Sequence, residues 1–98
     1  MIVRIVKLRF REEEVEAFKA YFDGISHQIR HFEGCQHLEL LQQVDDPRTF
    51  FTYSYWVDEQ ALENYRVSDL FKTFWTVAKS KFSDKPAAWS HRKVADVS

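Results

Sequence analysis

The sequence predicts one α+β domain over residues 1–98, with the strand and helix order βαββαβ of a ferredoxin-like unit and an antiparallel sheet that helices cover on one face. Three observations support this prediction: an alternating β-branched opening segment, a long amphipathic segment after it, and an aromatic strand that leads into a second helical region. The chain is 45% hydrophobic and 16% aromatic, with 2 Gly and 2 Pro, which is typical of a packed globular domain. Its 98 residues suffice for a single core.

The first half of the chain predicts a strand, a helix and a second strand. Residues 2–10, "IVRIVKLRF", alternate well enough to form the first strand. From residue 12 to residue 32 the apolar positions recur every three or four residues, as they do on one face of a helix. A turn at Gly34 then precedes "QHLELLQQV", residues 36–44, which we expect to form the second strand.

The second half predicts a turn, a strand, two short helices and a last strand. "DDPRT", residues 45–49, has turn composition and leads into the aromatic strand "FFTYSYW", residues 50–56. Asp58 fits an N-cap for "EQALENYR", and Ser68 fits one for "LFKTFWTVAKSKF", so we expect the helical region to break near Ser68. After "SDKPAAW", residues 89–94 form a weak last strand.

The aromatic strand directs large rings to both faces of the sheet. Helices can cover only one face, so the other would expose a contiguous apolar patch that monomeric proteins rarely tolerate. A second copy of the sheet, packed face to face about a two-fold axis, is the simplest cover. We therefore predict a homodimer whose interface includes Val3, Ile5, Phe51, Tyr53 and Tyr55.

Charge and cysteine content exclude several classes of function. The net charge of -1 gives no electrostatic footprint for nucleic acid or an anionic membrane, and the apolar runs are too short to span a bilayer. Cys35 is the only cysteine and fits a small core residue. His27 and His31 have a spacing that can bind metal, but no third ligand stands beside them, so we expect solvated residues and no metal. We expect a cytoplasmic protein.

The segments "MIVRIVKLRF", "HFEGCQHLEL", "FFTYSYWVDEQALENYRVSDLFKTFW" and "KPAAW", in this order and spacing, resemble the antibiotic biosynthesis monooxygenase (ABM) family of dimeric α+β barrel proteins. The resemblance covers nearly the whole chain. It implies a dimer of two sheets and a pocket between the sheet and the helices of each subunit. For some members it also implies cofactor-independent oxidation of phenolic or anthrone-like polyketides by O2; other members isomerise small molecules or degrade haem.

The haem-degrading branch of the resemblance is not expected to apply. Its pattern uses an Asn on the first strand, a Trp in the second helical region and a His beyond "SD-x-F". The corresponding positions in this chain hold Val6, Tyr65 and Trp75. Without that His and Asn there is no axial ligand at that position and no amide to orient bound oxygen.

The pocket implied by the resemblance would take residues from the helix-side face of the sheet and from the second helical region. Arg4 is the candidate catalytic residue, because its guanidinium could hold a phenolate or enolate. Alternatively, Arg4 forms an ion pair with a carboxylate. If the assignment of strand faces is shifted by one residue, Lys7 and Tyr55 replace Arg4 and Ser54 as pocket candidates. The helical aromatic residues also fit an ordinary core, and Trp89 fits either the pocket mouth or plain packing. The candidate substrate-binding residues are Arg4, Val6, Thr52, Ser54, Trp56, Tyr65, Phe71, Trp75 and Trp89.

Two functions fit these features. The first is a cofactor-independent monooxygenase that combines a small aromatic, polyketide-like substrate with O2. The second is a small-molecule-binding or stress-associated dimer without catalysis. RNA-recognition modules share the strand order, but the sequence lacks their Gly-containing signature and their positive charge.

Overall fold

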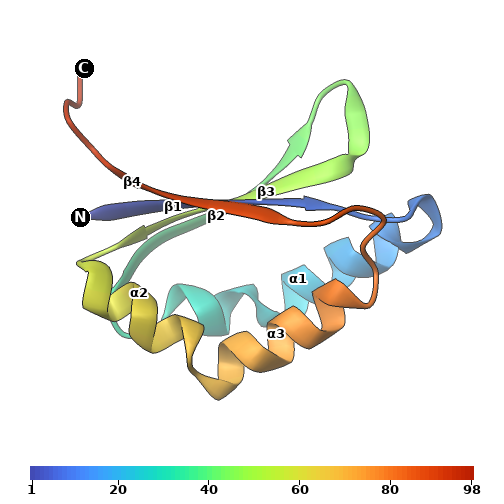
Figure 1. Ribbon diagram of the computed structural model, residues 1–98, viewed down its shortest axis with the longest axis horizontal. Coiled ribbons are helices and arrows are strands. Elements are labelled where there is room, and N and C mark those ends of the chain that lie inside the picture. The colour runs from blue at the N-terminus through green and yellow to red at the C-terminus, as the bar shows by residue number, and fades with distance from the viewer.

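Four antiparallel strands form one sheet in the order β2-β3-β1-β4 in the computed structural model, which describes residues 1–98. All helices lie on the same side of this sheet, and no helix lies on the opposite side (Figure 1). The predicted ferredoxin-like α+β fold is therefore confirmed. In chain order the elements are β1 (Ile2–Arg9), η1 (Glu12–Glu14), α1 (Val15–Arg30), β2 (Cys35–Gln43), β3 (Asp46–Trp56), α2 (Glu59–Arg66), α3 (Asp69–Lys79) and β4 (Ala87–Arg92).

The break between α2 and α3 follows from two side-chain caps. The Asp58 carboxylate accepts a hydrogen bond from the backbone N–H of Ala61 at 2.8 Å, and the Ser68 hydroxyl accepts one from the backbone N–H of Phe71 at 3.1 Å. Each cap satisfies an N–H group that the first turn of a helix leaves unpaired. Both predicted N-caps are confirmed, and they fix where the two helices begin under the sheet.

The turn predicted over residues 45–49 is shorter than expected. Strand β3 already begins at Asp46, and the chain reverses at residues 44 and 45. Pro47 is tolerated because it lies next to the register shift between Gln42 and Gln43, at the end of the hairpin where the ladder is interrupted. The last strand is also displaced from its predicted position, since β4 starts at Ala87.

The core lies between the helices and the inner face of the sheet. Phe10 and Phe18 are fully buried, and their rings stack with centroids 4.1 Å apart. Phe50 meets both rings edge-on at 5.8 Å. Cys35 is buried in the same core, as predicted. Aromatic packing thus fills one end of the space between sheet and helices.

The outer face of the sheet presents the aromatic side chains that the sequence assigned to a dimer interface. Ile5, Phe51, Tyr53 and Tyr55 remain half-buried in a single chain, and the hydroxyls of the two tyrosines lie 3.1 Å apart. Val3 differs, because its neighbours within the chain leave only 7% of it exposed. That these residues contact a second copy stays a prediction. None of the helices is both long and apolar enough to cross a bilayer.

Candidate functional site

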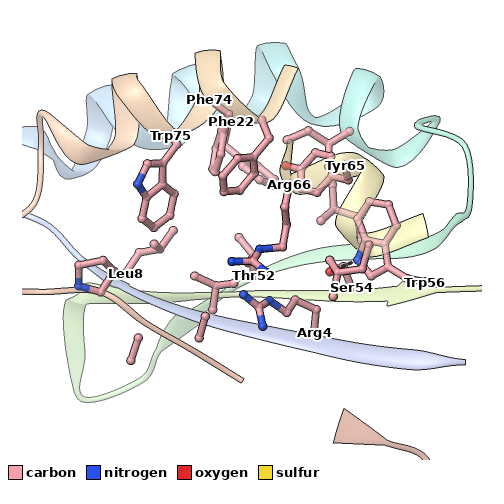
Figure 2. Close-up of a pocket in the computed structure, with 18 residues that line it drawn as sticks. Arg4, Leu8, Phe22, Thr52, Ser54, Trp56, Tyr65, Arg66, Phe74 and Trp75 are labelled. Atoms are coloured by element: carbon pink, nitrogen blue, oxygen red, sulfur yellow. Dashed lines mark hydrogen bonds between the residues drawn. The ribbon is translucent and has the colours of Figure 1, made fainter. Parts of the chain in front are cut away.

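A cavity of about 330 Å³ lies between the inner face of the sheet and helices α1, α2 and α3. Figure 2 shows side chains from both layers converging on it. The sheet contributes alternate residues of β1 and β3, because every second side chain of a strand points to the same face. Of the nine residues predicted to bind substrate, eight line the cavity: Arg4, Val6, Thr52, Ser54, Trp56, Tyr65, Phe71 and Trp75.

Two aromatic pairs form the ends of the cavity. At one end Trp56 stacks on Tyr65, with ring centroids 4.9 Å apart and planes inclined by 24°. At the other end Phe71 stacks on Trp75, with centroids 5.7 Å apart and planes inclined by 13°. Tyr65 meets Phe71 edge-on at 5.2 Å, so the two pairs form one continuous aromatic row. Figure 2 shows Trp56 and Trp75 on opposite sides of the space between them. These flat walls suit a planar aromatic ligand.

Ser54 holds the Trp56 wall in place. The indole Nε1–H of Trp56 donates a hydrogen bond to the Ser54 Oγ at 3.0 Å, and both residues are buried. Because a buried tryptophan N–H needs a partner, this bond fixes the orientation of the indole ring. Thr52 lies two residues before Ser54 on the same face of β3, so a second small residue with a hydroxyl group lines the cavity.

Arg4 extends from β1 into the cavity without an ion-pair partner. Its only side-chain hydrogen bond runs from Nη1 to the Ser90 Oγ at 3.0 Å, and no carboxylate lies within 4.0 Å. Burial lowers the pKa of Arg4 from its usual value, and the nearby Arg66 guanidinium lowers it further, whereas Glu63 opposes the shift. Within the chain, Arg4 forms no direct ion pair with a carboxylate.

Arg66 is a cavity residue that the sequence analysis missed. It is the last residue of α2, and its side chain points toward Arg4 from the opposite layer (Figure 2). Its Nη1 lies 3.3 Å from the Glu63 Oε2, and 49% of its side chain is exposed, which places it at the mouth of the cavity. Arg66 follows the buried Leu62 by four positions and so shares its helix face, but this spacing does not show that the face meets Arg4.

Trp89 does not line the cavity. It is paired with Ile5 across the β1–β4 ladder, so it lies on the outer face of the sheet, where 45% of it is exposed. The part of β4 that meets the cavity is the short run of small residues Ala87 and Ala88, after Pro86. The expectation that Trp89 belongs to the pocket is therefore corrected by the strand register.

Tyr65 is a neutral phenol in this site. Burial raises its pKa well above the usual range for tyrosine. At neutral pH its hydroxyl therefore retains its proton and can donate a hydrogen bond, but it cannot act as a base. The cavity lining contains no Asp, Glu or His.

The histidines predicted to be solvated lie on the surface of α1. His27 and His31 are exposed, and their rings stack 6.5 Å apart. No group of three or more His, Cys, Asp or Glu side chains comes together in the structure.

Comparison with known proteins identifies the family. The family model described as antibiotic biosynthesis monooxygenase matches residues 1–76. The chain belongs to the ABM family. No curated protein sequence matches it significantly.

Solved structures of ABM proteins share the fold. A protein from Nitrosomonas europaea, provisionally named an antibiotic biosynthesis monooxygenase, is 19% identical, with a TM-score of 0.88 over 97% of this chain and 100% of its own. A conserved protein from Methanosarcina mazei Go1 is 22% identical, with a TM-score of 0.87 over 95% and 93% of the two chains. A third, from Caulobacter crescentus CB15 and provisionally named like the first, is 15% identical, with a TM-score of 0.88 over 96% and 90%. At these identities the similarity establishes the ABM fold alone.

Proposed function

We propose that this ABM protein is a cofactor-independent monooxygenase that oxidises a small phenolic or quinol-like aromatic substrate with O2. The observation that carries the proposal is the cavity itself, in which two aromatic walls flank a guanidinium group with no carboxylate partner. Flat walls orient a ring, and a fixed positive charge stabilises the negative charge that develops on its oxygen.

The proposed reaction obtains all its electrons from the substrate. In an anthrone-like ring system, loss of a proton from the ring methylene group gives an electron-rich enolate. The enolate carbon transfers electrons to O2 and forms a C–O bond, and the resulting hydroperoxide loses water to leave a carbonyl. Overall, one methylene group and one molecule of O2 give one carbonyl group and one molecule of water. One oxygen atom therefore enters the product, and the other leaves as water.

Within this scheme Arg4 would stabilise the enolate or phenolate oxygen, and Tyr65 would donate a hydrogen bond to it. Because Arg4 has no carboxylate partner, its charge is available to the ligand. Trp56 and Trp75 would hold the ring between them. No lining group is a base at neutral pH, so the substrate proton would pass to solvent.

Oxygen consumption by the purified protein tests this function. We expect uptake with hydroquinones, anthrones or catechols that requires folded protein and falls at least about tenfold in Arg4→Gln. Lys72→Gln is the matched control, since it removes an exposed positive charge from α3, outside the cavity lining, and should leave uptake unchanged. Uptake that is equal in wild-type protein and in Arg4→Gln would contradict the role of Arg4.

A non-catalytic binding protein is the second candidate, and the absence of a base from the cavity lining favours it. Such a protein would bind the same rings in the same cavity and release them unchanged. Mass spectrometry of the ligand after incubation in air separates the two functions, because only the monooxygenase returns a product with one added oxygen atom. Saturable binding with complete ligand recovery would support the second candidate.

We also propose that two copies associate through the outer face of the sheet. The support is the apolar and aromatic face, which includes Phe51, Tyr53 and Tyr55 and which no helix covers (Figure 1). Light scattering at micromolar concentration tests the proposal. A mass twice the 11.8 kDa of one chain is expected, and a mass of 11.8 kDa would contradict it.

A further inference from the structure

We infer that the ligand of this cavity carries a carboxylate on its aromatic ring, and that Arg4 and Arg66 hold that carboxylate between them. The inference rests on the proposed function, because it assigns the substrate class of the same cavity. It adds a specificity-determining residue, Arg66, and a chemical group that the oxidation itself does not need.

The first support is the placement of two guanidinium groups in one small cavity. Arg4 reaches it from the sheet and Arg66 from the end of α2, and Figure 2 shows the two groups facing each other across the middle of the site. Two like charges at such a site repel each other, and Arg66 indeed disfavours the charged form of Arg4. A bound anion would convert this repulsion into two attractive contacts.

The second support is the charge balance of the site. The lining contains two arginines and no acidic residue, and the nearest carboxylate, that of Glu63, contacts Arg66 alone at 3.3 Å. Glu63 offsets one of the two positive charges, so the site retains a net charge of about +1. A monoanion neutralises that charge, whereas a doubly charged phosphate would reverse it.

The third support is the shape of the groups. A guanidinium is planar and presents its N–H donors as a fork that matches the two oxygens of a carboxylate. One carboxylate oxygen can face Arg66 and the other Arg4, and the remaining N–H donors of Arg4 can then contact a phenolate oxygen on the neighbouring ring carbon. The ring would lie between Trp56 and Trp75. The carboxylate would therefore fix the position of the ring relative to the aromatic walls, and with it the carbon that meets O2.

Calorimetric titration under nitrogen tests the inference with a matched ligand pair, 1,4-dihydroxy-2-naphthoate and its carboxamide. The two ligands share the ring and the phenols, and the amide lacks the negative charge and has an NH2 group in place of one acceptor oxygen. We expect wild-type protein to bind the carboxylate at least about tenfold more tightly than the amide, and added KCl to reduce this ratio. Arg4→Gln and Arg66→Gln should each lower the ratio, and the double variant should bring it close to one.

Two controls keep the outcomes separate. Lys72→Gln should retain the full ratio, and Arg66→Lys, which keeps the charge at an exposed position, should retain part of it if Arg66→Gln fails to fold. Equal binding of the two ligands, or a ratio that survives in the double variant, would overturn the inference and leave the aromatic cavity and its proposed function intact. If neither ligand binds, both the inference and the proposed function are contradicted.

Discussion

Replacing Ser54 by Ala removes the hydroxyl that accepts the hydrogen bond from the Trp56 indole N–H at 3.0 Å. Trp56 is 1% exposed and Ser54 is 5% exposed, so the N–H group would lose its partner away from bulk water. An unsatisfied buried donor costs about 1–3 kcal/mol, and this is the loss of unfolding free energy that we expect. In a domain of this size, each kcal/mol lowers the melting temperature by about 4–8 °C.

Denaturant unfolding followed by tryptophan fluorescence measures this loss. Ser90→Ala is the matched control, because Ser90 is exposed on β4 and its removal should change the unfolding free energy by less than about 0.5 kcal/mol. We also expect Ser54→Ala to weaken aromatic ligand binding, because the indole wall loses its fixed orientation. A stability within about 0.3 kcal/mol of wild type would refute the argument that this bond holds the wall.

Three further predictions concern acid stability, the Gly34 turn and association. The Thr49 hydroxyl and the Arg9 guanidinium lower the pKa of Asp46 to about 2. The ionised Asp46 therefore stabilises the fold fully above the usual pKa of an aspartate, and this contribution is lost as pH falls from about 4 toward 2. Asp46→Asn should flatten this part of a curve of melting temperature against pH. Gly34 has φ +91°, and a side chain there would collide with α2, so Gly34→Ala should lower the unfolding free energy by at least about 2 kcal/mol in urea. Tyr53→Asp places a charge on the proposed interface and should reduce the light-scattering mass to 11.8 kDa; an unchanged dimer would exclude this face.

The sequence predicted most of the fold because its local signals agree with one another. Asp58 and Ser68 occupy cap positions that local hydrogen bonding dictates, so the helix starts could be placed without tertiary information. Strand alternation grouped Arg4 with Val6 and Thr52 with Ser54, and the family resemblance indicated that both groups face the helices. Much of the cavity floor was therefore predictable.

The features that were missed depend on how elements pack against one another. Arg66 enters the cavity only because α2 lies over the sheet with its last turn above Arg4, and helix periodicity alone does not give that placement. The face of Trp89 is set by its register with Ile5, and a six-residue strand after a loop carries no signal for that register. Pro47 was assigned to a turn because of its composition, whereas its position beside a register shift allows it to stay in the strand.

Isotope labelling of the product tests directly whether the protein is a monooxygenase. The metal-free protein is incubated with a 1,8-dihydroxyanthrone that carries a carboxylate on its ring under 18O2, and the extracted quinone is analysed by mass spectrometry against a control in 18O-labelled water. The proposed mechanism predicts one 18O atom in each product molecule, formed faster with folded protein than with heat-denatured protein and more slowly with Arg4→Gln. A quinone whose new oxygen comes from water, or an anthrone recovered unchanged, would contradict a monooxygenase.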